Sequence, residues 1–397
     1  MKTGAVTILD LARLAGVSHS TVSRALNGSP LVKEATRRRI QELADAHQFS
    51  FHTGARSLRG VRTGVVALIY PRVLDTFGSS LYTQQLFLEL RRALEREELD
   101  TILVSAGNRE TGESHVKRLI RQNRVDGFLI IHGGLSREDY TLIREQGLPA
   151  VQLHNPPGSI PRNEVDCFLT DNRAGGALAA GHLLERGCRR ILTLAMAGGG
   201  SSGEGDTAPG RGTAEGASGP PAESCAPPQK GEPGETAART EGWRQALEEA
   251  GLTPREEDIL SCPCDYQAAY RLVLREEKRF RRADGLFAQA DILAFGAMTA
   301  LKELGIAVPG RIRVVGFDDS PLALLPPGGL TTVHQPREEL AAGAAARLKA
   351  LLSGEPEEPR LNLLIPPVLT VRGSSGDPVS GSEPHIRRHD PPQGVNT

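Results

Sequence analysis

The sequence contains few aromatic residues and no long apolar run. Aromatic side chains make up 4% of its 397 residues, and hydrophobic residues make up 39%. No run of roughly eighteen apolar residues occurs, so the sequence predicts no membrane-spanning helix. The N-terminal segment also lacks the apolar core and cleavage site of a secretory signal peptide, which favours a cytoplasmic protein.

Cysteine is scarce and scattered along the chain. The five cysteines are Cys167, Cys188, Cys225, Cys262 and Cys264. Cys262 and Cys264 lack the two-residue spacer of a zinc or redox pair, and no cluster of His and Cys completes a metal site. We therefore expect reduced cysteines, no bound metal and no cofactor.

Two segments have too few apolar side chains to fold. Residues 197–238 hold 11 Gly and 6 Pro, with no Leu, Ile, Val, Phe or Met. Residues 373–397 are likewise rich in Gly, Ser and Pro. Such segments bury too little apolar area to offset the entropy of ordering them. We predict a disordered insertion and a disordered tail.

Charge is unevenly divided along the chain. Residues 1–62 contain ten Lys or Arg against four Asp or Glu, a net charge of +6, whereas the remainder carries −7. A basic block on an acidic body is typical of a module that binds a polyanion. A chance fluctuation of surface charge is the alternative.

The first fifty residues have the pattern of three short helices. Thr7 and Asp10 have the spacing of a helix start, and Gly16 ends the first helix. Ser18 caps a second helix, and a third follows over about residues 33–48, with Arg37, Arg38 and Arg39 expected to point outward. Two short helices joined by a glycine-containing turn predict a helix-turn-helix. The alternative is a generic three-helix bundle with a solvated polar face.

The second helix carries side chains that suit the major groove of DNA. The positions expected to be exposed are His19, Ser20, Thr21, Ser23 and Arg24. Short hydroxyl groups and a guanidinium can reach base edges and phosphates. The pattern therefore favours double-stranded DNA as a partner.

From residue 62 to about residue 372, short apolar runs alternate with amphipathic stretches. Strands are expected at residues 64–69, 101–105, 127–131, 150–153, 190–195, 285–288, 314–317 and 330–334. Helices are expected at residues 84–97, 113–122, 137–146, 173–186, 240–250, 266–275, 291–304 and 336–352. This alternation predicts an α/β body with parallel sheets, which bind ligands at the carboxyl ends of their strands.

The N-terminal pattern resembles the headpiece of the lactose/galactose repressor (LacI/GalR) family. The resemblance is carried by residues 6–12 (VTILDLA), 15–18 (AGVS) and 21–28 (TVSRALNG). It implies that His19 and Ser20 select the operator bases and that Arg24 contacts the groove. The full set of headpiece residues that it places at DNA is Thr7, Ser18, His19, Ser20, Thr21, Ser23, Arg24 and Asn27.

The family also has a hinge with the signature Ala-Arg-x-Leu, which stands here as residues 55–58. The resemblance implies that Leu58, with Arg56 beside it, enters the minor groove as a wedge that kinks the duplex. The alternative is a linker leucine that packs on the body. Residues 49–52 read Phe-Ser-Phe-His where the family has Tyr-x-Pro-Asn, so the entry to the hinge departs from the family pattern.

The body resembles the two-lobed sensor that this family shares with periplasmic sugar-binding proteins. The matching segments are residues 169–176 (LTDNRAGG), 239–243 (RTEGW), 314–319 (VVGFDD) and 330–336 (LTTVHQP). The resemblance implies a helix-turn-helix headpiece over residues 1–50, a hinge over 51–61, a body over 62–372 and a tail over 373–397. Lobe 1 would comprise about residues 62–171 and 335–364, and lobe 2 about residues 172–333 and 365–372. The insertion at 197–238 would lie at the mouth of the ligand pocket, as a lid or as a tolerated surface loop.

The resemblance also implies an effector site between the lobes. Arg239 and Asp318 match positions that bind ligand hydroxyls or carboxylates, although a structural ion pair between them is the alternative. Gln335 lies at a crossover between the lobes, and Tyr266 matches an aromatic residue that stacks on the ligand.

Two further positions depart from the family pattern. His154 stands where an acid is common, and Ala290 stands before Asp291 where an asparagine is common. We still include His154 and Asp291 in the expected effector site. The departures indicate a ligand that differs from a simple sugar.

Together these features predict a homodimeric transcriptional repressor whose operator affinity is controlled by a small polar effector, a sugar or related metabolite. A dimer is expected because two hinges meet at one operator. The alternatives are a regulator that needs its ligand as a corepressor, a solute-binding protein, and an enzyme. The headpiece opposes the second, and the third lacks a nucleophile–base spacing or metal motif.

Overall fold

The computed structural model describes most of the chain as two compact units, residues 1–63 and 64–397. The described residues are 6–26, 29–47, 49, 62–70, 81–108, 110–131, 135–154, 164–197, 234–356, 359–376 and 386–388. Within these ranges, none of the helices combines the length and hydrophobicity that a membrane crossing requires.

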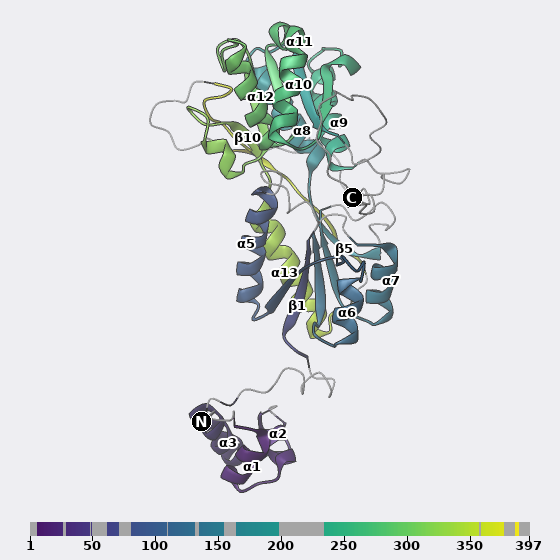
Figure 1. Ribbon diagram of the computed structural model, residues 1–397, viewed down its shortest axis with the longest axis vertical. Helices are drawn as coiled ribbons and strands as arrows, with labels where there is room; N and C mark the ends of the chain where they lie inside the picture. The colour runs from purple at the N-terminus through teal and green to yellow at the C-terminus, as the bar shows by residue number, and fades with distance from the viewer. Residues whose placement is uncertain are drawn as a thin grey trace, which may run out of the picture. The chain divides into compact units, whose positions relative to one another are not determined.

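The first unit is a three-helix bundle (Figure 1). Its helices are α1 (Ile8–Ala15), α2 (His19–Leu26) and α3 (Glu34–Ala46). Each helix contributes one fully buried large side chain to the core, namely Leu11, Val22 and Ile40. Apolar side chains on one face of each short helix account for the packing, since such helices are unstable alone.

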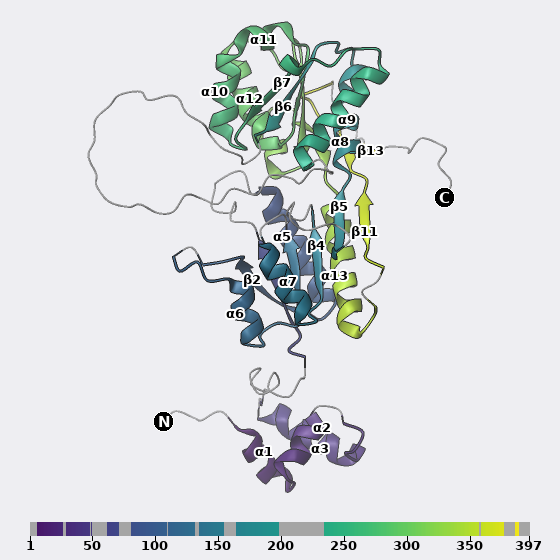
Figure 2. The same ribbon diagram turned by 90° about the vertical axis from the view of Figure 1, so that its right-hand side faces the viewer.

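The first sheet of the body, the sheet of lobe 1, has the strand order β11-β5-β4-β3-β1-β2. The strands are β1 (Val65–Tyr70), β2 (Asp100–Ser105), β3 (Gly127–Ile131), β4 (Ala150–Leu153), β5 (Asp166–Thr170) and β11 (Asn362–Ile365). All of these strands pair in parallel, and β11 lies beside β5 although nearly two hundred residues separate them in sequence (Figure 2).

Helices cover both faces of this sheet. They are α5 (Leu81–Arg96), α6 (His115–Arg121), α7 (Arg137–Glu145) and α13 (Arg337–Ser353). Along β1, Val66 and Leu68 pack in the cluster that includes α5 and α13, whereas Ala67 and Ile69 pack in the cluster that includes α6. This two-residue alternation explains why a doubly covered strand is apolar throughout.

The second sheet, the sheet of lobe 2, has the order β13-β12-β10-β9-β8-β6-β7. Its strands are β6 (Ile191–Met196), β7 (Ile259–Cys262), β8 (Gly285–Ala288), β9 (Arg313–Asp318), β10 (Thr331–His334), β12 (Val368–Thr370) and β13 (Ile386–Arg388). Pairing is parallel except where β12 joins β10 and β13. The fold class predicted from the sequence, a helical headpiece with a two-lobed α/β body, is confirmed.

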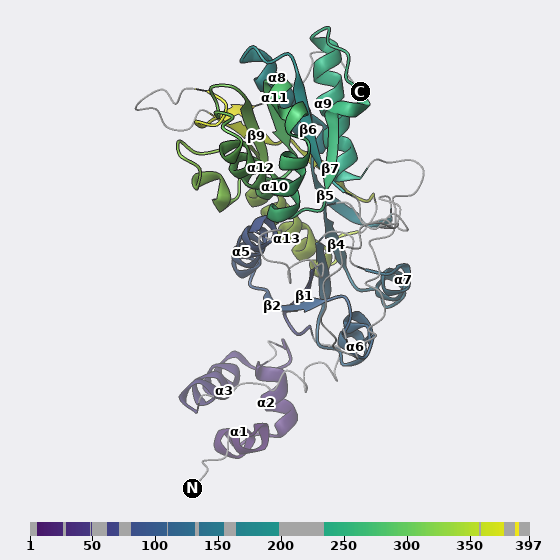
Figure 3. The same ribbon diagram turned by 45° about the horizontal axis from the view of Figure 1, so that its top comes forward.

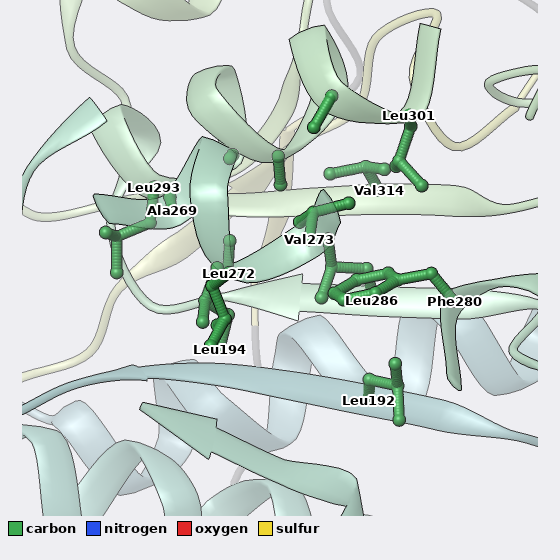
Figure 4. Close-up of a cluster of buried hydrophobic side chains, with 14 of the residues drawn as sticks. Leu192, Leu194, Ala269, Leu272, Val273, Phe280, Leu286, Leu293, Leu301 and Val314 are labelled. Atoms are coloured by element: carbon green, nitrogen blue, oxygen red, sulfur yellow. The ribbon is translucent and has the colours of Figure 1, made fainter. Parts of the chain in front are cut away.

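Helices also cover both faces of the second sheet (Figure 3). On one face lie α8 (Asn172–Glu185) and α9 (Glu235–Glu249), and on the other lie α10 (Tyr266–Arg275), α11 (Glu277–Arg282) and α12 (Asp291–Glu303). Figure 4 shows the core between the second sheet and α10 and α12. There Leu192, Leu286 and Val314 of the sheet pack against Leu272 of α10 and Leu301 of α12.

The chain passes between the sheets three times. The crossings join β5 to α8, β10 to α13, and β11 to β12. Side chains at these crossings can contact both lobes. A ligand or a substitution that alters their contacts can therefore alter the position of one lobe relative to the other.

Two expectations about the polar segments were wrong at their edges. Helix α9 begins at Glu235, inside the predicted insertion, because an acidic residue in the first turn favours a helix start. Residues 373–376 are buried rather than disordered: Ser374 Oγ donates to the Val314 carbonyl and accepts from the Thr331 amide. Ile386–Arg388 form β13 within the predicted tail. The remaining residues of both segments lie outside the described part of the chain.

Helices α8 and α9 approach each other closely because glycines lie at their contact. A Cβ atom at Gly242 would lie 1.9 Å from the carbonyl oxygen of Arg173, and one at Gly176 would lie 2.0 Å from that of Arg239. Both obstacles are backbone atoms, which cannot move aside as a side chain does. The two glycines therefore fix the position of α9 and of Arg239.

Replacing Gly242 with Ala is expected to lower the free energy of unfolding by about 1–3 kcal/mol through overpacking. Urea unfolding followed by fluorescence of Trp243 measures this, because Trp243 is the single tryptophan and is fully buried beside Gly242. Gly181→Ala is the matched control on α8, where no atom lies within 4 Å. It should raise stability by about 0.5–1 kcal/mol; equal effects of the two changes would contradict the close-contact account.

Candidate nucleic-acid interface and interlobe site

The start of the headpiece is fixed by local hydrogen bonds. Thr7 and Asp10 form a capping box: Thr7 Oγ1 accepts from the Asp10 amide, and Asp10 Oδ2 accepts from the Thr7 amide at 2.9 Å. Gly16 ends α1 with φ 64°, in the left-handed region that glycine adopts without strain. Ser18 Oγ then accepts from the Thr21 amide at 3.2 Å and begins α2.

The exposed face of α2 carries three of the predicted base-reading residues. His19, Ser20 and Arg24 are exposed, and Thr21 is half-buried. The expectation that Ser23 is exposed was wrong, since only 3% of it is accessible. Ser23 lies on the side of α2 that carries Val22 and Ala25 into the core, and a small hydroxyl fits there. Thr7 and Ser18 are exposed, but their hydroxyls take part in the helix caps.

Arg37 of α3 holds the turn between α2 and α3. Its Nη2 donates to the Ser29 carbonyl at 3.0 Å, and its Nη1 donates to Glu34 at 2.9 Å. The expectation that Arg37 points outward with Arg38 and Arg39 was therefore wrong for Arg37. The predicted DNA contacts Asn27, Arg56 and Leu58 lie outside the described residues.

In the body, Arg239 of α9 is buried at the crossing between the lobes, with 2% of its surface exposed. Its Nε donates to Asn172 Oδ1 at 2.7 Å, and its Nη1 donates to the Gln289 carbonyl at 2.6 Å. The guanidinium also lies 3.8 Å above the ring of Phe317. These contacts orient Arg239 fully, and they leave Nη2 directed at Glu235, 4.0 Å away.

Asp318 lies at the end of β9 and is linked to the other lobe through Gln335. Gln335 Nε2 donates to Asp318 Oδ1 at 2.7 Å, and Gln335 Oε1 accepts from Thr170 Oγ1 at 3.0 Å. Burial raises the pKa of Asp318 to about 6, although the charge of Arg239 acts in the opposite direction. Arg239 forms its ion pair with Glu235 rather than with Asp318.

Asp291 supports the turn that holds Asp318. Its Oδ1 accepts from Thr332 Oγ1 at 2.6 Å, and its Oδ2 accepts from the amide and hydroxyl of Ser320 at 2.7 and 2.9 Å. Asp318 has φ 114°, a conformation that such anchoring maintains. Burial, with a smaller contribution from Asp318, raises the pKa of Asp291 well above its usual value.

His154 joins lobe 1 to lobe 2. It follows β4 with φ 63°, and 1% of it is exposed. Its Nε2 lies 3.1 Å from the Tyr82 hydroxyl, and its Nδ1 lies 3.4 Å from Glu235 Oε1. Tyr82 and Glu235 were not predicted from the sequence. Glu235 precedes Arg239 by one helical turn, which is the one local signal for it.

We call the residues that meet at the crossings the interlobe cluster. They are Tyr82, His154, Asn172, Glu235, Arg239, Gln289, Asp318 and Gln335. The cluster contains four of the six predicted effector residues, and Asp291 supports it.

The sixth predicted residue, Tyr266, begins α10 and packs with Tyr270 and Phe295, at ring centroid distances of 6.3 and 5.6 Å. Cys264, two residues earlier, interacts electrostatically with Asp318 and Arg239 of the cluster. Burial raises the pKa of its thiol to about 12, and Asp318 adds to the effect. The turn before α10 therefore lies near the cluster.

A cavity of about 30 Å³ lies elsewhere in lobe 1, lined by residues that include Arg137, Tyr140, Arg144 and Glu164. None of the predicted effector residues lines it. It is far smaller than the pockets of about 300–1,000 Å³ that hold small molecules, so it does not compete with the interlobe cluster as a site for a metabolite.

A helix-turn-helix unit joined to two α/β lobes, with polar side chains gathered at their crossings, defines the class of ligand-responsive DNA-binding regulators. The chain matches "Bacterial regulatory proteins, lacI family" over residues 7–50. It matches "Periplasmic binding proteins and sugar binding domain of LacI family" over 63–219 and "Periplasmic binding protein-like domain" over 180–375. The chain belongs to the LacI family and is a DNA-binding regulator controlled by a small-molecule effector.

Similar proteins extend over nearly the whole chain. The HTH-type transcriptional repressor PurR of Vibrio atlanticus is 28% identical over 368 residues, which cover 91% of this chain and 97% of PurR. The structure of the transcriptional regulator CelR–cellobiose complex is 27% identical, with a TM-score of 0.61 over 93% of this chain and 99% of that one. The lac repressor dimer bound to operator and the anti-inducer ONPF is 21% identical, with a TM-score of 0.70 over 94% and 99%, and shows the fold alone. These relatives are regulators, not enzymes.

Proposed function

We propose that the protein is a cytoplasmic, homodimeric repressor whose affinity for a palindromic operator is set by a small polar effector at the interlobe cluster. The observation that carries the proposal is the chain of contacts across the lobes. Thr170, Gln335 and Asp318 form one link, and His154 and Glu235 form another. A ligand that replaces such contacts changes the balance between two arrangements of the lobes, which is the requirement for allosteric control.

In this proposal the DNA contacts divide by role. His19 and Ser20 read base edges from α2, and Arg24 contacts the groove. Thr21 and Asn27 bind phosphates, and Arg56 and Leu58 of the hinge enter the minor groove. Ser23 is a packing residue and is not included.

The effector contacts in this proposal come from Arg239, Asp318, Gln335 and His154, with Tyr266 alongside and Asp291 as support. The cellobiose complex of one relative and the word repressor in the name of another support a polar effector and repression. A regulator that needs its ligand as corepressor is the second candidate. We assign no catalytic step to the protein.

Replacing Arg24 with Ala is expected to weaken binding to the preferred operator by about 1–3 kcal/mol, or about 5- to 150-fold. The operator is first selected from fragmented genomic DNA by the full-length protein, and affinity is then measured by fluorescence anisotropy. Arg38→Ala on α3 is the matched control, because it removes the same charge from another exposed position, one that pairs with Glu42. Equal losses for the two variants would show that net charge, not groove contact, accounts for binding.

A further inference from the structure

The carboxylate of Glu235 lies between one donor from each lobe. Glu235 Oε1 is 3.4 Å from His154 Nδ1 of lobe 1, and Glu235 Oε2 is 4.0 Å from Arg239 Nη2 of lobe 2. A charge-assisted hydrogen bond has a length of about 2.7–2.9 Å. Both separations are longer, so neither donor holds the carboxylate of Glu235 at that length.

The two flanking groups are oriented as donors by other contacts. Arg239 uses Nε and Nη1 for Asn172 and Gln289, so Nη2 is the group that faces Glu235. Burial raises the pKa of Tyr82 well above its usual value, so its hydroxyl keeps the proton and can donate to His154 Nε2. With Nε2 as acceptor, the ring hydrogen resides on Nδ1, the nitrogen that lies 3.4 Å from Glu235 Oε1.

The backbone limits where the carboxylate of Glu235 can lie. Glu235 is the first residue of α9, directly after the N-cap Gly234, and Arg239 follows one turn later on the same helix. The short tether fixes how far the carboxylate can reach toward His154. A carboxylate on a free ligand has no such tether and can approach both donors at hydrogen-bond distance.

We propose that His154 Nδ1 and Arg239 Nη2 form an anion position between the lobes, which Glu235 fills in the absence of effector and which a carboxylate of the effector takes over. The inference rests on the proposed function and specifies its effector as an acid. Glu235 is then a specificity-determining residue.

The exchange is electrostatically balanced. One carboxylate replaces another beside Asp318, so the charge of the interlobe cluster stays the same when Glu235 swings out. The side chain of Glu235 is already 18% exposed, so it has a route to solvent. At the N-terminus of α9 its charge still interacts favourably with the helix dipole after leaving. A neutral ligand would leave the displaced charge of Glu235 unreplaced between His154 and Arg239.

Acetate tests this position directly, because it is a free carboxylate without a tether. In full-length Glu235→Ala, 100 mM sodium acetate is expected to raise Tm by about 3 °C over sodium chloride of equal ionic strength, with saturation. Wild type should show no acetate-specific rise at this concentration, because acetate lacks the other contacts of the effector and does not displace Glu235. Glu235→Gln should show none either, because its side chain still fills the position. Removing His154 as well, in Glu235→Ala/His154→Ala, should abolish the rise.

Glu241→Ala is the matched control, since Glu241 lies on the same helix, is exposed and pairs with Arg173. It should behave as wild type. Equal acetate shifts in all variants, or none in Glu235→Ala, would overturn the anion position. The assay contains no DNA, so this failure is separate from a failure of the regulator to bind its operator.

Discussion

Replacing Asp318 with Asn is expected to raise the free energy of unfolding of the body by about 2–3 kcal/mol at pH 7–8 and to abolish the response to effector. Burial raises the pKa of Asp318 from 3.8 to about 6, with Arg239 acting against the rise. Each pKa unit corresponds to about 1.4 kcal/mol. The amide oxygen of Asn still accepts from Gln335, so the change removes the buried charge and keeps the hydrogen bond.

The sign of the pH dependence follows from the direction of the shift. The folded protein holds the Asp318 proton more tightly than the unfolded chain does. Below about pH 4 the carboxyl is protonated in both states, so it does not lower the free energy of unfolding. The loss of unfolding free energy caused by Asp318 grows as the pH rises toward 6, and it reaches its full size above that value. Wild type should therefore lose stability between pH 4 and 6 relative to Asp318→Asn, as urea unfolding followed by Trp243 fluorescence would show.

Replacing the neighbouring Asp319 is a control, because it should change stability in the direction opposite to Asp318→Asn. Burial alone would raise the pKa of Asp319, but hydrogen bonds from His334 and Arg372 hold it below its usual value. Arg372 Nη2 lies 2.8 Å from Asp319 Oδ1, and His334 Nδ1 lies 3.1 Å from Oδ2. Asp319→Asn should lower stability at neutral pH. Parallel pH profiles for wild type and Asp318→Asn would contradict the assigned cost of the buried charge.

Replacing Arg239 with Met is expected to lower the free energy of unfolding by about 3–5 kcal/mol, because it removes a buried cation and leaves the half-buried carboxylates of Glu235 and Asp318 without it. Met keeps much of the apolar stem but removes the hydrogen bonds to Asn172 and Gln289 and the contact over Phe317. The same variant should no longer bind effector, while its headpiece still binds DNA.

Urea unfolding again measures the loss, and Arg244→Met is the matched control on α9. Arg244 pairs with Glu256, whose side chain is exposed, so its loss should cost less than about 1 kcal/mol. The double variant Arg239→Met/Asp318→Asn should be less destabilised than Arg239→Met alone, since it also removes the Asp318 carboxylate that has lost the nearby cation. A single-variant loss no larger than that of Arg244→Met would show that Arg239 is not supported by the buried network.

Local chemistry made the headpiece predictable from sequence. The cap at Thr7, the turn at Gly16 and the cap at Ser18 act within a few residues of each other, and all three were confirmed. Burial of individual positions was harder to predict. Ser23 and Arg37 are polar, and polarity alone predicted exposure, but a small hydroxyl packs inward and a guanidinium turns back to the Ser29 carbonyl.

The body was predictable as a fold and only in part as a site. Central strands such as β3 and β9 are continuous apolar runs, whereas the edge strand β11 has exposed leucines and gave no clear pattern. Tyr82 and Glu235 reach the interlobe cluster from positions 72 residues before and 81 residues after His154. Only tertiary packing brings them together, and the one local signal is the spacing of one helical turn between Glu235 and Arg239.

The most direct measurement is the affinity of the full-length protein for its selected operator with and without an effector, identified by thermal-shift screening of sugars, nucleosides and small acids. In wild type the effector should change the operator affinity by about 5- to 150-fold, the usual range of allosteric coupling. In Arg239→Met the affinity should be the same with and without effector. A wild-type affinity that the bound effector leaves unchanged would contradict control of DNA binding from the interlobe cluster.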